Sequence, residues 1–593
     1  IHFEKSAGGL ATGLNSLPTS YEKHWIGWPG IYTDNSETEK ELDLSLGSYN
    51  FHPVFLSEDD MENYYEGYSN STLWPLFHYF YIYTVHDDHY WQAYKRVNIL
   101  FLEKVLEVAT NRDILWIQDY HLMLLPMIVR EHLPSIRIGF FLHIPFPSYE
   151  LFRTLENREE ILNGLLGSDL IGFHTFNYMR HFISALARIT GIESDDNMFH
   201  YGNRTLSVDT FPMGINYDSF YKSSRKPAVK KFTSSFRERY SDRKIILSVD
   251  RLDYSKGIPG RLEAFRLLLE NHPEWTGKVS LLMILVPSRD NVDRYNDLKT
   301  SIDELTGNIN GRFSQPGWIP IHYFYKGFSF NELTAFYHES DVALVTPLRD
   351  GMNLVAKEYV AAKAKKPGVL ILSEMAGAAI ELTDAILVNP NNTAEIAGAL
   401  NTALLMPEKE QKARLARMQK KLRNHDVVRW AGDFIDKLEK IHLRQKDLKR
   451  KYLSQHQAGE IAREFMKAGR KLIILDYDGT LVPFVNDPAK ALPGEALKEL
   501  LENLSRAEGV ELAIVSGRDR DFLESVLGFL AISIFAEHGA LRRVEGKWES
   551  LYRKDLSWQP EIVRIMKEIT DNTPGSHIEK KKTSLVWHYR KTD

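Results

Sequence analysis

The chain has 593 residues, 43% of them hydrophobic and 26% charged, which is the composition of a globular protein with the length of roughly three or four domains. Its 74 Lys and Arg against 79 Asp and Glu give a net charge of −5 without a basic block, which argues against a nucleic-acid partner. The absence of cysteine excludes disulfides, thiolate metal sites and a cysteine nucleophile. The apolar runs are strand-sized and the first residues resemble no signal peptide, so we expect a cytoplasmic protein with no membrane span.

Short apolar runs predict parallel sheets. Each run is four to eight residues long and is followed by a turn and an amphipathic stretch, a pattern typical of strands joined by helices. The runs begin at Ile114, Ile136, Asp169, Lys244, Val279, Asp341 and Gly368, and a further series begins at Lys471. A charged stretch, Lys222 to Arg243, separates the first two series. We therefore predict doubly wound domains at 1–232 and 233–440, a helical linker at 441–470, and a third α/β domain at 471–593.

Two segments near the N-terminus suit a sugar or phosphate ligand. Gly8 and Gly9 would let backbone amides approach an anion closely. The sequence YYEGYSNSTLW, residues 64–74, combines aromatic rings with hydrogen-bonding side chains, which suits stacking on a sugar. Each segment has an ordinary alternative, a glycine turn for the first and an aromatic core for the second.

A pair of cations follows the strand KIILSV. Arg251 and Lys256 come on the loop VDRLDYSKG, at the carboxyl end of a strand, where open parallel sheets bind ligands. Fixed positive charges there suit a diphosphate leaving group. The alternative is two solvated loop residues.

The segment TPLRDGMNLVAKEYVAA predicts a glycine-containing turn and then a helix from about Met352. Asp350, before the turn, can accept hydrogen bonds from sugar hydroxyls, and Glu358 is placed to hold both hydroxyls of a ribose. His143 ends an apolar strand and so lies at the ligand edge of a sheet, with a satisfied core histidine as the alternative. Asp119 has the same two alternatives, a ligand-binding residue at the edge of the sheet or a structural residue of the core.

Eight ordered segments over roughly residues 6–440 together resemble trehalose-6-phosphate synthases: SAGGLATGL, WIGWPG, NSTLWPLFHYF, IQDYHLMLLP, FFLHIPFPSYELFR, VDRLDYSKGI, TPLRDGMNLVAKEYVA and GVLILSEMAGAA. The resemblance implies a GT-B glycosyltransferase of two Rossmann-like domains with its active site in the cleft between them. It implies that α,α-trehalose 6-phosphate and UDP are made from UDP-glucose and glucose 6-phosphate, with retention at the donor carbon. It implies no enzymic nucleophile and no cofactor for this reaction.

The resemblance also assigns residues. Arg251 and Lys256 would bind the donor diphosphate, Glu358 its ribose, and Asp350 and His143 the transferred glucose. The full donor set is Gly8, Gly9, Arg251, Lys256, Asp350, Gly351, Met352, Asn353, Leu354 and Glu358, the acceptor set is Trp28, Tyr65, Trp74, Asp119 and Arg289, and the catalytic set is Asp119, His143, Arg251, Lys256 and Asp350. In this family a strand ending in an Asn-Arg pair precedes the glycine loop, and the present sequence begins after it.

The third domain carries a different motif. In LIILDYDGTLVPF, Asp476 and Asp478 follow a strand, and Ser516 follows the next one in AIVSGR. With FAEHGA and SLVWHYR, these segments resemble trehalose-6-phosphate phosphatases of the haloacid dehalogenase type. The resemblance implies that Asp476 attacks phosphorus, that Asp478 acts as acid and base, and that both carboxylates bind Mg²⁺.

The lysine and the final acidic pair of such phosphatases do not occur in the sequence up to Asp593. We therefore expect an incomplete, inactive phosphatase domain in this chain, through truncation or natural loss.

Two alternatives to the synthase stay open. One is a regulatory protein that binds trehalose phosphate, and the other is a synthase that uses another nucleotide-glucose donor. The expected partners are UDP-glucose, glucose 6-phosphate, UDP and trehalose 6-phosphate, and a homo-oligomer is compatible with the sequence.

Overall fold

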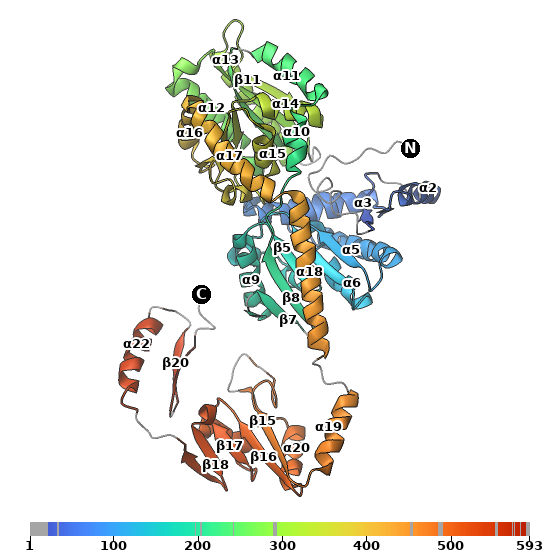
Figure 1. The fold of residues 1–593 in the computed structure, drawn as a ribbon, viewed down its shortest axis with the longest axis vertical. Coiled ribbons are helices and arrows are strands. Elements are labelled where there is room, and N and C mark those ends of the chain that lie inside the picture. Colours follow the sequence, from blue (N-terminus) through green and yellow to red (C-terminus); the bar gives the residue numbers. More distant parts are fainter. Residues whose placement is uncertain are drawn as a thin grey trace. The chain divides into compact units, whose positions relative to one another are not determined.

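The computed structural model describes residues 22–31, 35–195, 197–201, 204–240, 242–288, 293–450, 455–483, 485, 490–551, 556–571, 573, 576–581 and 583–588. Gly8, Gly9 and Arg289 lie outside this range. The chain divides into two compact units, Ile1–Lys449 and Arg450–Asp593. Both units contain parallel strands alternating with helices, which confirms the predicted α/β class (Figure 1).

The first sheet belongs to the N-terminal half of the first unit. Its strands, in spatial order, are β3 (Ile114–Gln118), β4 (Arg137–Leu142), β5 (Leu170–Phe173), β8 (Arg204–Thr210), β7 (Met198–Tyr201) and β6 (Ser194–Asp195). The first four run parallel, and the last two form an antiparallel edge. The helices of this half are α5 (Asp88–Val108), α6 (Leu125–His132), α7 (Tyr149–Phe152), α8 (Arg158–Leu165) and α9 (Phe176–Thr190). Phe140, Leu162 and Phe182 are fully buried in its core.

Local signals set the ends of these helices. Asp87 caps α5 by accepting a hydrogen bond from the amide of His89, and Thr175 caps α9 in the same way from Tyr178. Gly191 ends α9 in the left-handed conformation, with φ of 74°.

Several short elements precede the sheet in the chain: β1 (Trp25–Gly27), α2 (Ser36–Gly47), β2 (Phe51–Pro53), α3 (Glu58–Asp60), the π-helix η1 (Met61–Leu73), α4 (Trp74–Phe77) and the short turn η2 (Tyr81–Tyr83). The turn η3 (Tyr120–Leu122) follows β3.

The second sheet is wholly parallel. Its order is β11 (Ile321–Tyr325), β10 (Val279–Val286), β9 (Lys244–Arg251), β12 (Val342–Val345), β13 (Val369–Ser373) and β14 (Ile386–Val388). The helices of this half are α10 (Tyr217–Ser223), α11 (Pro227–Tyr240), α12 (Ile258–Asn271), α13 (Asp293–Phe313), α14 (Phe330–Glu339), α15 (Leu354–Ala362), α16 (Thr393–Leu405) and α17 (Glu408–Asn424), with the short turns η4 (Tyr254–Lys256), η5 (Pro273–Trp275) and η6 (Gly377–Ile380). Because helices cover both faces, β10 is buried almost throughout, as its continuous apolar sequence requires.

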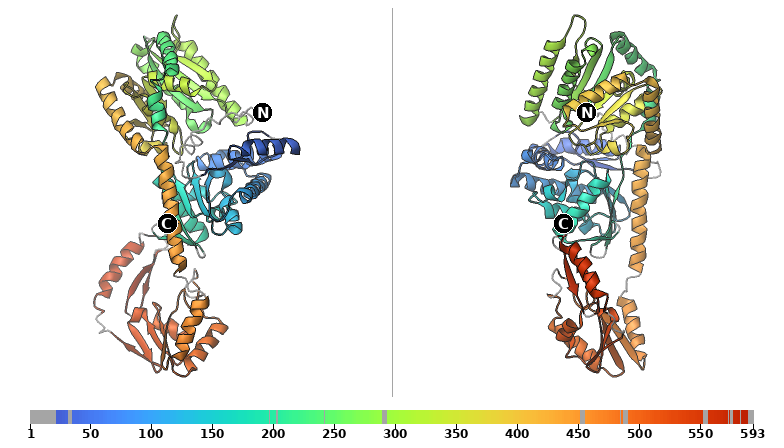
Figure 2. Two further views of the ribbon diagram at one scale, coloured as in Figure 1. Left: turned by 45° about the vertical axis from the view of Figure 1, so that its right-hand side comes forward. Right: turned by 90° about the vertical axis from the view of Figure 1, so that its left-hand side faces the viewer.

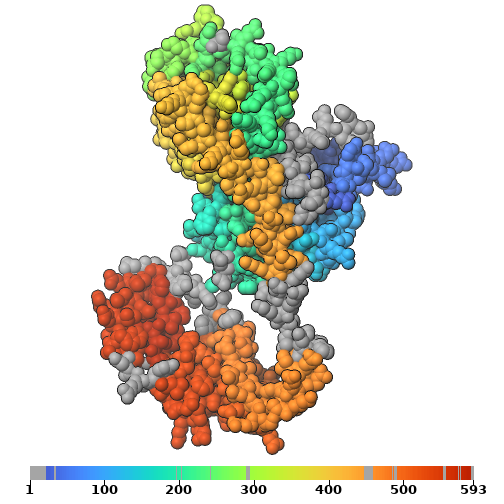
Figure 3. Space-filling view, in the orientation of Figure 1, coloured from blue at the N-terminus to red at the C-terminus, as the bar shows by residue number. Residues whose placement is uncertain are grey.

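Helix α18 (Val427–Arg450) returns from the second half to the first. Phe434 and Leu438 of this helix pack with Phe141 and Leu170 of the first sheet. Figures 2 and 3 show α18 running from the second half along the first. The predicted boundary at 232–233 lies inside α11, which packs on α14 of the second half. The domain ranges stay a prediction.

The second unit contains a sheet of five described strands. Their order is β15 (Lys471–Asp476), β16 (Val510–Val515), β17 (Ser533–Ala536), β18 (Leu541–Val544) and β19 (Lys547–Ser550), the first three parallel and the others antiparallel. The helices α19 (Gln455–Lys467), α20 (Glu495–Arg506) and α21 (Arg520–Leu527) and the turn η8 (Glu537–Gly539) belong to this unit. A hairpin of β20 (His577–Lys580) and β21 (Leu585–His588) is in contact with α22 (Gln559–Asp571).

Candidate active site

The first unit brings Arg251 of the predicted donor set against Trp74 of the predicted acceptor set, at the carboxyl end of β9. Arg251 is the last residue of β9, and its guanidinium lies 5.7 Å from the centre of the Trp74 ring of the other half. The Tyr178 hydroxyl of α9 donates a 3.1 Å hydrogen bond to the carbonyl of Asp350. The two halves therefore meet where the sequence predicts ligand-binding residues.

Lys256 and Asp350 form the central ion pair. The Lys256 ammonium donates to the Asp350 carboxylate over 2.6 Å, and both side chains are largely buried. The Asn353 amide donates to the same carboxylate over 3.0 Å. Burial alone would raise the pKa of Asp350, but the Lys256 charge and these hydrogen bonds hold it below its usual value. An ionised Asp350 is an acceptor only, which suits sugar hydroxyls.

The turn after Asp350 is built by close packing and a helix cap. A Cβ on Gly351 would lie 2.0 Å from the carbonyl oxygen of His143, so only glycine allows the two halves to approach here. Helix α15 begins at Leu354, two residues later than predicted. Asn353 stands at its N-cap with φ of 71° and accepts a hydrogen bond from the amide of Ala356. Asn tolerates this conformation and caps well, which explains the later start.

Asp119 and His143 lie side by side on neighbouring strand ends. The Asp119 carboxylate accepts hydrogen bonds from the amides of Tyr120, at 3.0 Å, and His143, at 3.2 Å. The backbone of Asp119 has φ of 69° and ψ of 173°, a region that normally only glycine occupies and that is found in strained functional segments. Burial raises the pKa of Asp119 to about 6, while both amides and the charge of Arg251 oppose the rise.

The His143 ring is neutral near pH 7. Burial lowers its pKa to about 3, and its Nε2 lies 2.9 Å from the Gln118 side-chain oxygen. If that oxygen accepts, Nε2 carries the proton. A neutral imidazole can orient a hydroxyl without adding charge to the site.

The aromatic residues of the predicted acceptor set lie in different surroundings. Trp74 is buried beside Arg251, whereas Tyr65 is partly exposed and stacks on His121 with ring centres 5.5 Å apart. Trp28 donates from its indole nitrogen to the carbonyl of Ile31 and packs against the first core. Tyr64 and Tyr68 are buried, so most of segment 64–74 is the aromatic core that sequence reasoning kept as the alternative.

Glu358 lies partly buried on α15. It accepts a 2.9 Å hydrogen bond from the hydroxyl of Tyr337. Burial raises the pKa of Glu358 to about 7, although the Tyr337 hydrogen bond opposes the rise. The carboxylate is therefore poised between its two protonation states at neutral pH.

Three further residues that contact the predicted site residues were not predicted from the sequence. His78 is buried under Trp74, with ring centres 4.0 Å apart, and Tyr178 and Tyr337 orient Asp350 and Glu358 as described. Burial lowers the pKa of His78 to about 4. His78 belongs to the segment NSTLWPLFHYF, which was the one sequence feature that pointed to it. The residues around Tyr178 and Tyr337 in the sequence give no indication that these tyrosines contact Asp350 and Glu358.

Comparison with known proteins identifies this arrangement. Glycosyltransferase family 20 matches residues 1–440, and the trehalose-phosphatase family matches residues 474–593. The chain belongs to glycosyltransferase family 20. A bifunctional trehalose-6-phosphate synthase/phosphatase of Thermoproteus tenax is 43% identical to it, over 99% of this chain and 82% of that protein. An α,α-trehalose-phosphate synthase [UDP-forming] A of Dictyostelium discoideum is 39% identical, over 99% of this chain and 80% of that protein.

Solved structures agree for the first unit. A UDP-forming α,α-trehalose-phosphate synthase of Burkholderia xenovorans in complex with glucose-6-phosphate is 35% identical with a TM-score of 0.68, covering 73% of this chain and 97% of that one. A structure from E. coli bound with UDP-2-fluoro glucose is 36% identical with a TM-score of 0.68, covering 74% of this chain and 97% of that one. The family 20 chain is thus an enzyme of the UDP-forming trehalose-phosphate synthase class that carries a trehalose-phosphatase domain.

The phosphatase domain places its predicted residues around one turn. Asp476 ends β15 and is exposed, and Asp478 is two residues further on. The Arg518 guanidinium donates to both carboxylate oxygens of Asp478, over 2.8 and 2.6 Å. Ser516 is buried after β16, and its hydroxyl accepts a hydrogen bond from the amide of Arg518.

Asp476 and Asp478 are the carboxylates that a magnesium ion would meet at this turn. Mg²⁺ prefers oxygen ligands in near-octahedral geometry and usually keeps several waters, and in this structure the Asp478 carboxylate is engaged by Arg518. Within the described parts of the chain, no group of three or more His, Asp or Glu could hold a metal ion.

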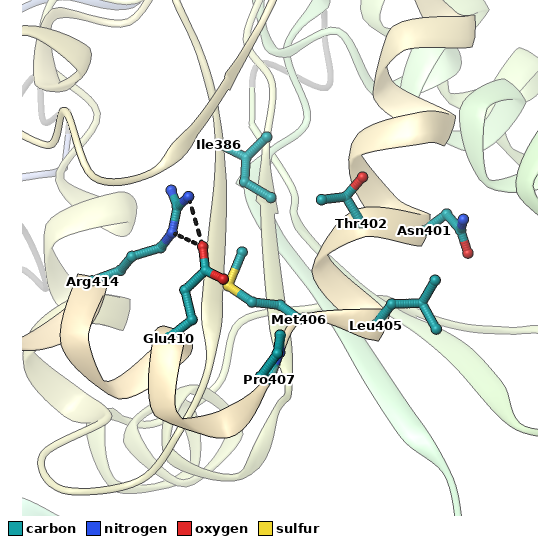
Figure 4. A pocket seen from close by; sticks show the side chains of 8 residues that line it. All are labelled: Ile386, Asn401, Thr402, Leu405, Met406, Pro407, Glu410 and Arg414. Atoms are coloured by element: carbon teal, nitrogen blue, oxygen red, sulfur yellow. Dashed lines mark hydrogen bonds and ion pairs between the residues drawn. The ribbon is translucent and has the colours of Figure 1, made fainter.

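A pocket of about 500 Å³ lies elsewhere, beside α16 and α17 (Figure 4). It contains none of the predicted site residues, and its Glu410 and Arg414 pair with each other over 2.9 Å. We assign it no ligand. Of the helices that the structure describes, none is both long and apolar enough to cross a membrane.

Proposed function

We propose that this family 20 enzyme transfers glucose from UDP-glucose to glucose 6-phosphate. The products are α,α-trehalose 6-phosphate and UDP, and the configuration at the donor carbon is retained. The observation that carries the proposal is the meeting of Arg251 with Trp74 across the two halves, because it joins the predicted diphosphate and acceptor sites in one place.

Two side-chain cations would stabilise the leaving group. As the bond between the glucose carbon and the diphosphate oxygen breaks, negative charge develops on UDP, where Arg251 and Lys256 offer fixed positive charge. We propose that this step requires no divalent metal and no resident cofactor, because these two residues supply the charge.

The acceptor would attack from the face that UDP leaves. Its hydroxyl proton passes to the departing phosphate oxygen as the new glycosidic bond forms, so no enzymic nucleophile is needed. The neutral His143 and the ionised Asp350 would hold the hydroxyls of the transferred glucose, which fixes its orientation during the transfer. Glu358 would accept hydrogen bonds from the ribose hydroxyls.

The relatives support these assignments. The Burkholderia xenovorans synthase binds glucose-6-phosphate, and the E. coli structure binds a fluorinated UDP-glucose. Both superpose on the unit that contains Arg251, Lys256 and Asp350.

Product analysis by NMR tests the proposal. The full chain is offered UDP-, GDP- and ADP-glucose in turn with glucose 6-phosphate, with and without EDTA. We expect the α,α-linked product from UDP-glucose at the same rate in both conditions. Binding of both sugars without product would favour the regulatory alternative, and a product from another donor alone would overturn the choice of UDP-glucose.

A further inference from the structure

Arg261 of α12 is fully buried and joins three separate segments of the second half. Its guanidinium donates to the hydroxyl of Thr346 over 3.1 Å and to the carbonyl of Lys256 over 2.9 Å. It also donates to the side chains of Ser248 and Asp250 near the end of β9. The planar guanidinium group has enough donors to hold all these acceptors at once.

The joined segments are those that carry the Lys256–Asp350 ion pair. Lys256 follows β9, and Asp350 follows Thr346 in the segment after β12. The amide of Leu348 donates to the carbonyl of Ser255 over 2.7 Å, so the same two segments are also joined directly. Arg261 therefore fixes the main chain from which the Lys256 ammonium extends.

Stability alone gives a poor account of this arrangement. A buried ion pair such as Arg261 with Asp250 costs desolvation, and apolar residues of similar volume are often as stabilising or more so. A fixed orientation of the hydrogen-bonded segments is what an apolar cluster would not provide.

We propose that Arg261 is a positioning residue that holds the Lys256 ammonium where it meets the diphosphate of the donor. The inference rests on the proposed function, because that function gives Lys256 its role. The Lys256 ammonium is buried and paired with Asp350 over 2.6 Å, so its side chain has little freedom to compensate, and a displacement of its main chain moves the charge relative to the leaving group. Misplacement by about 1 Å can cost on the order of 100-fold in rate.

Binding of UDP and of uridine to the full chain tests the proposal. Arg261→Lys keeps a positive charge near Asp250 but loses the fork that reaches Thr346 and the Lys256 carbonyl. We expect it to weaken UDP binding by about 10-fold and to lower kcat by roughly 100-fold, with uridine binding and the KM for glucose 6-phosphate unchanged. A purely structural role would change UDP and uridine binding alike.

Arg130→Lys is a matched control. Arg130 is also buried, pairs with Asp169 over 2.7 Å and bonds to the carbonyl of Gly167, but it lies at the amino ends of β4 and β5, away from Lys256. We expect Arg130→Lys to lower the melting temperature while the ratio of UDP to uridine affinity and kcat stay as in the unmodified chain.

A double-mutant cycle completes the test. If Arg261 acts through Lys256, Arg261→Lys produces no further loss of UDP affinity in a Lys256→Ala background. Additive losses, or an unchanged UDP affinity in the single variant, would overturn the proposal. If Arg261→Lys fails to fold, Thr346→Val removes one of the acceptors, and we expect a loss of about 3-fold in UDP affinity with the same dependence on Lys256. Absence of glucose transfer by the unmodified chain would instead count against the proposed function, while the UDP and uridine measurements still decide the role of Arg261.

Discussion

Lys256 and Asp350 are 94 residues apart in sequence, and in the structure the Lys256 ammonium lies 2.6 Å from the Asp350 carboxylate. Lys256 therefore does two things in our account. It keeps Asp350 ionised for the sugar hydroxyls, and it supplies charge to the departing diphosphate.

Loss of either cation that faces the UDP leaving group should lower turnover much more than it lowers folding stability. We expect Lys256→Ala and Arg251→Ala each to lower kcat by a few hundred-fold, about 3 kcal/mol of barrier, because each removes charge where UDP leaves. Lys299→Ala removes a partly exposed lysine that is paired with Asp303 over a similar 2.6 Å, and it should leave kcat unchanged. Steady-state kinetics measure these effects. Rates near those of the unmodified chain in both Lys256→Ala and Arg251→Ala would contradict the role of these residues in stabilising the departing diphosphate.

The charge of Arg251 should also affect the pH dependence of kcat/KM. Asp119 has a pKa of about 6, raised by burial and held down in part by Arg251. Arg251→Met removes the opposing charge, so the pKa of Asp119 rises further and the acidic limb of the kcat/KM profile moves to higher pH. Arg239→Met, an exposed change on α11, serves as the control. If the acidic limb of the kcat/KM profile of Arg251→Met stays in place or moves to lower pH, the charge of Arg251 does not act on Asp119 as proposed.

Glu358→Gln should increase stability and reduce donor binding. The pKa of Glu358 is about 7 in the folded chain against an ordinary value of 4.5, so the folded state binds more protons between these values. Stability therefore falls as pH rises from 4.5 through 7, and the full penalty is present above pH 7. Because Glu358 is partly exposed, we expect a gain of about 1–3 kcal/mol at pH 8 from the neutral amide.

The gain from Glu358→Gln should shrink at pH 5, where the folded carboxyl is already protonated. Thermal unfolding at the two pH values measures it, with Glu304→Gln on the exposed face of α13 as control. UDP affinity should fall because a ribose hydroxyl loses a charged acceptor. Equal stability changes at both pH values would show that burial of the charge is not the cause.

Gly351→Ala tests the contact between the two halves. The added Cβ would lie 2.0 Å from the carbonyl oxygen of His143, so the backbone must move apart at the site itself. We expect a loss of about 1–3 kcal/mol in stability and at least roughly a 10-fold fall in kcat. Gly398→Ala in α16 meets nothing within 4 Å and should stabilise the chain slightly. A fully active Gly351→Ala variant would show that this close approach does not matter for transfer.

The phosphatase domain should release no phosphate from trehalose 6-phosphate in excess Mg²⁺. Arg518 holds both oxygens of Asp478, so this carboxylate must leave Arg518 before it can bind Mg²⁺. A phosphate assay on the 593-residue chain, with Asp476→Asn as the paired control, measures this. Phosphate release that disappears in the control would disprove the expectation.

The apolar runs predicted as strands are strands in the structure, because their signal is local. The runs beginning at Ile114, Lys244, Val279 and Lys471 correspond to β3, β9, β10 and β15, whereas no predicted run covers β8 or β11. The predicted start of α15 is Met352 rather than Leu354, since the capping role of Asn353 depends on an unusual backbone angle that composition does not reveal. Site residues at strand ends were found by the same local logic, whereas Tyr178, Tyr337 and Arg261 sit inside ordinary helices.

The sequence by itself determined the α/β class, the two motifs at strand ends and the family resemblance, because apolar runs and short motifs are properties of neighbouring residues. Only the tertiary structure decided that Arg251 lies beside Trp74, that Lys256 pairs with Asp350, and that α18 returns to the first sheet. Such contacts join residues far apart in the chain and leave no local periodicity. They form because the carboxyl ends of parallel strands gather at one edge and buried charges there must find partners.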